Sequence, residues 1–172
     1  MTRLPQPAAA TASRWLAAVL LAATGTALQG QPADPASALA ALDVAGRAIA
    51  AAGCPRPLEV RSRYLPDPAR PQVRDEMVST DCRGWRVAVY RPGAVAGSDR
   101  PLSVVVEDHH PLLLPPLEVG ATEAAVRATL GEPAQRFGAN LSYRLPGREA
   151  DRVTFEIEAG IVRVISFNWS VD

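Results

Sequence analysis

Apolar residues recur at helical spacing in residues 36–52, an alanine-rich stretch with Leu42 and Ile49 on one face. Gly53 and Pro55 follow directly, and such a pair is typical of a helix end. Downstream the spacing changes to two, which predicts strands with one buried and one solvated face. The predicted strands of the first half are residues 58–64, 77–80, 85–91 and 102–106, with a proline-rich loop at 66–71 and a hairpin turn at 81–84.

A second helix is predicted from Thr122 to Leu130. The Thr122 hydroxyl can accept a hydrogen bond from an amide of the first turn, and Val126 lies on the same face as Leu130. Gly131 suits the left-handed position after a helix, and Pro133 prevents its continuation. A helix this short depends on packing for its stability.

Alternation at every second position resumes after this helix. Ala159 and Gly160 form a predicted tight turn between two strands. In the last strand the pattern places Ile161 on the buried side and Val162 on the other, with Arg163 interrupting the apolar row. A helix followed by an antiparallel meander predicts a two-layer α+β fold, with short helices packed on an antiparallel sheet. The predicted strands of the second half are residues 141–145, 153–158 and 161–169.

The second half also carries a family resemblance. Its pattern is Gly-x-Thr-x-x-x-Val-x-x-x-Leu-Gly-x-Pro, formed by Gly120, Thr122, Val126, Leu130, Gly131 and Pro133, and followed by Tyr143 and by Gly160, Val162 and Ile165. Over roughly the last third of the chain this resembles the SmpA/OmlA-type domain, a small outer-membrane lipoprotein component of the barrel-assembly machinery. The same fold unit occurs in β-lactamase inhibitor protein. The resemblance implies a small envelope domain that binds other proteins.

The two halves of the chain show the same order of elements. Each has a helix, a strand that ends with a tyrosine and, two or three residues later, a proline, and a hairpin, which turns at Gly84 or at Gly160. We therefore predict two tandem helix-plus-three-strand units, although short α+β units of similar composition can also look alike. The predicted organisation is a signal peptide at 1–27, a flexible lead-in at 28–35, an N-terminal α+β unit at 36–108, a Pro/Leu-rich connector at 109–118 and a C-terminal SmpA/OmlA-like unit at 119–172.

The N-terminus has the residue order of a secretory signal peptide. Arg3 and Arg14 precede the apolar run 15–23, and the small residues Gly25 and Ala27 suit cleavage after Ala27. The run is too short for an ordinary membrane span, and the alternatives are an uncleaved anchor or a core helix. No cysteine follows the run, where a lipoprotein would need one. We therefore expect a periplasmic or secreted protein without a lipid anchor or a transmembrane span after cleavage.

Charge and cysteine content narrow the range of functions. The 172 residues include 18 acidic and 18 basic ones, and every basic residue is an arginine. This balance favours neither nucleic acid nor an anionic membrane surface as a partner. Cys54 and Cys82 are the two cysteines, and an even count in an exported chain predicts a disulfide. A redox pair and two free thiols are the alternatives.

We expect no enzyme activity and no cofactor, because the chain lacks a catalytic motif. It contains no Gly-x-Ser-x-Gly, no P-loop and no Gly-x-Gly-x-x-Gly. His109 and His110 are the one cluster with metal-ligand chemistry. Neighbouring residues of a strand point to opposite faces, however, so the two imidazoles cannot both chelate from regular strand geometry. This favours a polar strand end over a metal site.

Residues 112–117 read Leu-Leu-Leu-Pro-Pro-Leu, and the prolines exclude a helix or a central strand. An extended apolar segment between two units is either a packing strap or an exposed docking surface. Two tryptophans leave the same choice, since tryptophan occurs both in cores and at binding hot spots. The candidate interface residues are Leu112, Leu113, Leu114, Leu117, Trp85 and Trp169.

Three functional hypotheses follow. The first is an exported envelope protein that acts by binding another envelope protein, in outer-membrane assembly or maintenance. The second is an inhibitor of a periplasmic or secreted hydrolase, by analogy with the inhibitor that shares the fold unit. The third is a metal- or ligand-binding protein that uses His109 and His110.

Overall fold

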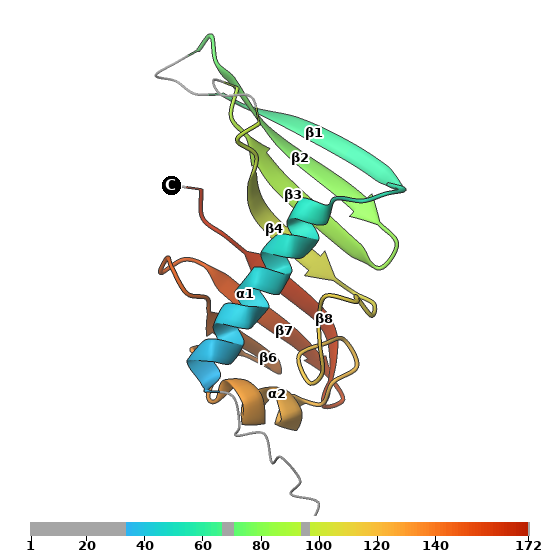
Figure 1. The fold of residues 1–172 in the computed structure, drawn as a ribbon, viewed down its shortest axis with the longest axis vertical. Coiled ribbons are helices and arrows are strands. Elements are labelled where there is room, and N and C mark those ends of the chain that lie inside the picture. The colour runs from blue at the N-terminus through green and yellow to red at the C-terminus, as the bar shows by residue number, and fades with distance from the viewer. Residues whose placement is uncertain (1–33, 67–70, 94–96, 172) are drawn as a thin grey trace, which may run out of the picture. The chain divides into compact units, whose positions relative to one another are not determined.

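The computed structural model describes residues 34–66, 71–93 and 97–171. The predicted signal peptide, 1–27, lies outside the described residues. From residue 34 onward the described chain belongs to one compact unit, with the element order shown in Figure 1. The elements are α1 (Pro35–Ala52), β1 (Glu59–Pro66), β2 (Arg74–Cys82), β3 (Trp85–Arg91), β4 (Arg100–Val106), α2 (Glu123–Leu130), β5 (Gln135–Phe137), β6 (Asn140–Arg144), β7 (Arg152–Glu158) and β8 (Ile161–Asn168).

All eight described strands form a single antiparallel sheet, which confirms the α+β class. The strand order is β1-β2-β3-β4-β8-β7-β6-β5. Each half of the chain therefore contributes one helix followed by four strands, one more than in the predicted repeat unit. The four strands of the first half were each predicted, whereas β5 of the second half was not expected from the sequence. The last strands of the two halves, β4 and β8, pair at the centre of the sheet. The halves thus share one sheet and one hydrophobic core.

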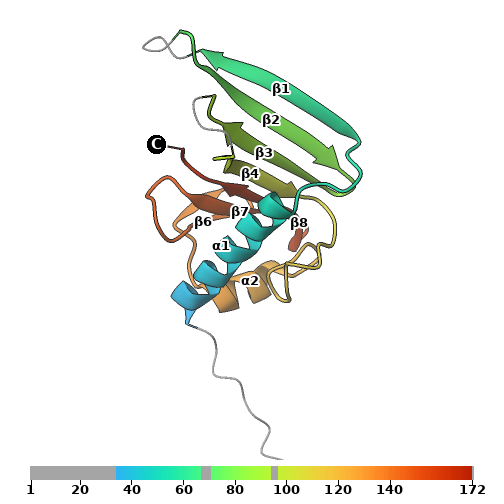
Figure 2. The same cartoon turned by 45° about the horizontal axis from the view of Figure 1, so that its top comes forward.

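Both helices lie on the same side of the sheet in the two views of Figures 1 and 2. The longer helix, α1, packs on β4 and β3 and also contacts α2. Its buried residues are Ala38, Leu42, Gly46 and Ile49, at the spacing of one helical face. Within the described chain α1 is the one helix long and apolar enough to cross a membrane by length and composition. Here its inner face packs in the core.

The short helix α2 begins and ends as the sequence predicts. The Thr122 hydroxyl accepts a hydrogen bond of 3.2 Å from the Ala125 amide. Gly131 follows the helix with φ 74°, a value that favours glycine, and its amide donates to the Arg127 carbonyl at 2.9 Å. The Tyr143 hydroxyl of β6 donates to the Gly131 carbonyl at 3.2 Å. This hydrogen bond links the C-terminal end of α2 directly to β6 of the sheet.

The buried side of β8 differs from the prediction at its start. The register shifts so that Glu156 pairs with Val164 while its neighbour Ile157 pairs with Val162, which leaves Arg163 as an extra residue. Such a bulge moves the following side chain to the other face. Val162 is therefore buried, and Ile161 is only partly covered. The prediction for these two residues was wrong because simple alternation cannot represent a bulge.

The disulfide between Cys54 and Cys82 is present, as predicted. It spans 28 positions in sequence, and its Cα atoms are 6.0 Å apart. One cysteine follows α1 and the other ends β2. The bridge therefore links the end of α1 to β2, the strand next to the edge strand β1.

Candidate binding surfaces

The predicted metal-ligand cluster does not form a metal site among the described residues. His109 Nδ1 lies 3.1 Å from Glu118 Oε2, and the His110 ring packs edge-on against Trp85 with centroids 5.6 Å apart. Burial lowers the pKa of His110, and the neighbouring His109 adds to this effect. No group of three or more His, Cys, Asp or Glu in the described chain could hold a metal ion. The two imidazoles therefore have separate partners.

The apolar connector is divided between core and surface. Leu113 and Leu117 are buried in the hydrophobic core, whereas Leu112 is 42 % exposed and Leu114 is 70 % exposed. These two side chains flank an apolar groove against Ala41 and its neighbours on α1. Leu113 and Leu117 were predicted as interface residues, but in this structure their side chains point into the core and cannot contact a partner.

The two tryptophans of the predicted interface also have internal roles. Trp85 packs against the core and is half-buried. Trp169 is almost completely buried and stacks on Phe167, with ring centroids 5.7 Å apart. Its indole N–H donates to Asp43 Oδ1 at 2.8 Å. Trp169 therefore cannot be an exposed contact residue in this structure.

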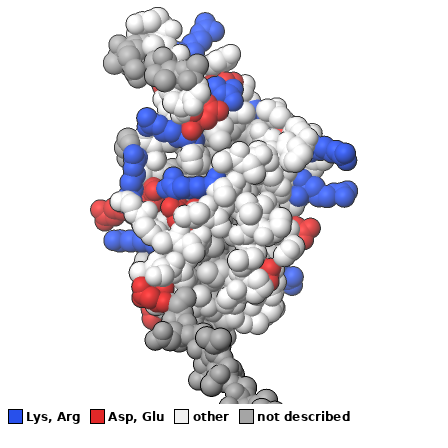
Figure 3. All heavy atoms as spheres, in the orientation of Figure 1, with Lys and Arg blue, Asp and Glu red and all other residues white. Residues whose placement is uncertain are grey.

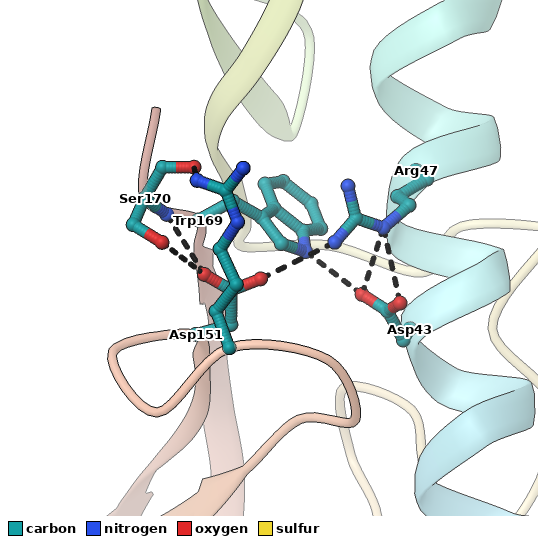
Figure 4. Close-up of polar contacts among 6 residues, drawn as sticks. Asp43, Arg47, Asp151, Trp169 and Ser170 are labelled. Carbon is teal, nitrogen blue, oxygen red and sulfur yellow. Dashed lines mark hydrogen bonds and ion pairs between the residues drawn. The ribbon is translucent and has the colours of Figure 1, made fainter. Parts of the chain in front are cut away.

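A polar cluster surrounds Trp169 and links α1 to the C-terminal segment (Figure 4). Arg47 of α1 pairs with Asp43 at 3.0 Å and lies over the Trp169 ring, 5.2 Å from its centroid. Its guanidinium also approaches Asp151 at 3.4 Å. Asp151 is buried and accepts from the Ser170 amide at 2.8 Å and from the Ser170 hydroxyl at 2.9 Å. Because each polar group of the cluster has a partner within it, we interpret the cluster as stabilising the packing of α1 against the C-terminal segment.

Asp75 of β2 is a second buried carboxylate that sequence reasoning missed. It accepts a hydrogen bond from the Tyr90 hydroxyl and another from the Gly93 amide, at 2.9 Å. Gly93 is required at this position because a Cβ atom would lie 2.3 Å from the Arg74 carbonyl oxygen. The spacing of these residues along the chain gives no signal that they meet. Their contacts stabilise the end of the β2–β3 hairpin.

The side of the sheet opposite the helices, here termed the open face, is not covered by any described helix or connector (Figures 1 and 2). Residues that are directly opposite on paired strands point to the same face. One row of the open face crosses from β1 to β6 through Arg61, Ser79, Ala88, Ser103, Asn168, Arg152 and Arg144. The next row crosses all eight strands through Glu59, Asp81, Arg86, Val105, Ser166, Thr154, Ser142 and Gln135. Within this row the short side chain of Ser142 is buried.

The two rows share a pattern of side-chain size and charge. Their middle positions are small or uncharged, and we term these six residues the central strip: Ser79, Ala88, Ser103, Val105, Thr154 and Ser166. Charged side chains stand on both sides of the strip, and several are paired. Arg86 pairs with Asp81, Arg61 pairs with Glu59 at 2.7 Å, and Arg152 donates to Gln135 at 2.7 Å.

The first strand, β1, is an edge with little burial on either face. Val60 and Tyr64 point to the helix side, yet they are 56 % and 62 % exposed, and Leu58 just before the strand is 74 % exposed. The predicted buried face of this strand was therefore wrong. α1 packs mainly on β3 and β4, so the apolar residues of β1 stay uncovered.

The helix-bearing side shows an uncharged area over its middle, with charged side chains gathered mostly toward its margins (Figure 3). The outer residues Ala40, Ala41 and Val44 of α1 are exposed and apolar. Val44 has the largest of these side chains and is mostly exposed to solvent.

Comparisons with known proteins return no match: no family model fits the chain, and no curated protein or solved structure matches it. The resemblance to the SmpA/OmlA-type domain therefore stays a prediction.

Proposed function

We propose that this chain is an exported binding module of the cell envelope, which acts on another protein through the open face of its sheet. The observation that carries the proposal is the central strip. A solvated sheet face normally carries polar and charged side chains, but here the central strip is small and uncharged and crosses five neighbouring strands, β2, β3, β4, β8 and β7. Protein interfaces have this anatomy, because charged residues are depleted at their centre and arginine is enriched relative to other surface.

The chemistry of the strip fits a protein partner better than a small ligand. Hydroxyls of Ser79, Ser103 and Ser166 supply adaptable hydrogen bonds, and Val105 adds apolar area. A small ligand would instead need a concave site that buries most of its surface. Because its side chains are short, the central strip can be contacted by a protruding loop or helix of a partner protein.

The proposed setting rests on two features. Residues 1–27 have the order of a secretory signal, and the disulfide between Cys54 and Cys82 suits an oxidising compartment such as the periplasm. The SmpA/OmlA resemblance adds outer-membrane assembly or maintenance as the process. Purification from the envelope fraction with the first 27 residues removed is the expected result for the protein in its host.

Site-specific photo-crosslinking tests the surface. A photoreactive amino acid replaces Ser103 or Ser166 in the central strip, and Val44 on the outer side of α1 serves as the matched control. We expect the first two positions to capture the same partner in the native host and Val44 to capture none. The variant Ala88→Arg should abolish capture, whereas Ser37→Arg on α1 should leave it unchanged. Equal capture at Val44, or none at the strip, would contradict the proposal.

The identity of the captured protein separates the two binding hypotheses. A component of outer-membrane assembly supports the first. A hydrolase whose activity falls in proportion to bound protein supports the inhibitor hypothesis, for which the same uncovered face provides the area.

We also infer that the two halves are related copies of a two-layer unit with one helix and four strands. The support is the symmetric strand order, in which β4 and β8 meet at the centre and β1 and β5 form the edges. The helices of the two halves differ in length, since α1 has 18 residues and α2 has 8. Superposition of α2 to β8 on α1 to β4 in an experimental structure tests this, and mismatched strand positions would reject it.

A further inference from the structure

The outer edge of β1 has the properties of a site for strand addition. The strand order places β1 at the end of the sheet, and no described strand pairs with its outer edge. The strand has 8 residues. This is long for an exposed edge strand, since proteins usually keep edge strands short or cover them. An exposed edge carries unpaired backbone N–H and C=O groups that a further strand can bind.

The side chains of this edge are sorted by face. Val60 and Tyr64 are exposed apolar residues on the helix side, with Ser62 between them. The exposed Leu58 precedes the strand at the position that the same alternation would place on this side. Glu59 and Arg63 are exposed on the open side and carry opposite charges. An edge protected against association would carry charges on its apolar side as well.

We propose that β1 pairs in an antiparallel manner with β1 of a second copy of this chain, about a two-fold axis that passes through Arg61. In this register Leu58 faces Tyr64 of the second copy, and Glu59 faces Arg63 of the second copy. Each pair occurs twice because the axis repeats it. Apolar and opposite-charge pairs that are directly opposite each other stabilise a sheet, so the edge is complementary to itself.

Neighbouring registers are less favourable. An axis through Ser62 would place Arg61 opposite Arg63 of the second copy twice and would leave Glu59 without an opposite charge, whereas the proposed register has a single Arg61–Arg61 pair. Like charges directly opposite each other are destabilising. An axis through Val60 would leave Tyr64 beyond the end of the paired strand. In the proposed register the two Arg61 side chains meet at the axis. Each donates to Glu59 of its own chain at 2.7 Å and approaches Asp81 at 3.3 Å, which offsets the repulsion.

The arrangement has a consequence for the open face. A two-fold axis perpendicular to the sheet keeps the same face of both copies on one side. The two sheets then continue into each other, and their open faces become one surface. Because the contact is essentially one strand pair, we expect a weak dimer, with a dissociation constant in the micromolar range or above.

Cysteine crosslinking tests the register on the intact, processed protein. Arg61→Cys places two thiols at the axis, at a separation that a disulfide can bridge. Arg144→Cys, an exposed position on the same face in β6, is the matched control. After mild oxidation we expect a covalent dimer for Arg61→Cys, with the link mapped to the introduced thiols of the two copies, and none for Arg144→Cys. Equal crosslinking of the two variants would overturn the register.

Analytical ultracentrifugation tests the dimer without new cysteines. The double variant Leu58→Lys with Tyr64→Lys places like charges opposite each other in both pairs, and we expect the dissociation constant to rise at least tenfold. Both side chains are exposed, so the thermal midpoint of the monomer should stay unchanged. The proposal is overturned if the unsubstituted protein remains a monomer at its highest soluble concentration. A dimer that the double substitution leaves intact overturns it equally, because another surface would then hold the copies together.

Discussion

At the scale of single residues, Gly46 shows how packing can reverse a local preference. It lies within α1, where glycine costs about 1 kcal/mol relative to alanine. The Phe167 ring of β8 occupies the space beside it, and an added Cβ atom would lie 2.6 Å from the ring. Close approach of helix and sheet therefore requires glycine here. From the sequence alone, Gly46 indicates only a position of low helix propensity.

We predict that Gly46→Ala lowers the free energy of unfolding by about 1 to 3 kcal/mol, because overpacking of the core outweighs the gain in helix propensity. Urea denaturation measures the change. Ala40→Gly, at an exposed position of the same helix, is the control and should cost about 1 kcal/mol from propensity alone. A stabilised Gly46→Ala variant would show that the helix can move away from Phe167.

At the scale of elements, the disulfide holds the α1–β1 connection against the β2–β3 hairpin. The loop it closes spans 28 positions, for which the chain-entropy model gives about 3 to 4 kcal/mol. We predict that the double variant Cys54→Ser with Cys82→Ser loses most of this stability, as measured by urea denaturation. Reductant should destabilise the original protein to the same extent and leave the double variant unaffected. A response of the double variant to reductant would show that the effect does not come from this bond.

Elements with strong local signals were predictable, and those defined by their neighbours were not. α2 has its own cap and stop, and β7 alternates regularly, so both follow the sequence. β5 has only 3 residues, none of them buried, and exists because β6 is there to pair with it. The exposure of β1 and the bulge at Arg163 depend on where α1 lies and how β7 pairs, which periodicity does not contain.

At the scale of the whole molecule, the cluster around Asp151 joins the two halves. We predict that Asp151→Ala lowers the free energy of unfolding by about 1 to 3 kcal/mol, because it leaves the partly buried Ser170 amide without its acceptor. Asp151→Asn retains an acceptor oxygen and should cost less, mainly through the lost attraction to Arg47. Urea denaturation gives both values, and amide hydrogen exchange at Ser170 should be faster in the alanine variant. A cost near zero would mean that water replaces the carboxylate.

The candidate surfaces followed from the sequence only in part. Leu112 and Leu114 are exposed beside the groove on α1, but Leu113, Leu117 and Trp169 are buried. An apolar run cannot show which of its members turn inward, since that depends on the elements beneath it. The open face was not predicted at all. Its members come from separate strands, and they form a surface only through the register between strands.

The sequence by itself determined the α+β class, the positions of most helices and strands, and the cysteines available for a bridge, because periodicity, caps and composition act over short distances along the chain. Tertiary structure decided the rest. It joined both halves into one sheet through the pairing of β4 with β8. It placed the helices on one face and left the other open, and it left β1 as a free edge of the sheet. These features arise from contacts between residues far apart in sequence, and no local pattern encodes them.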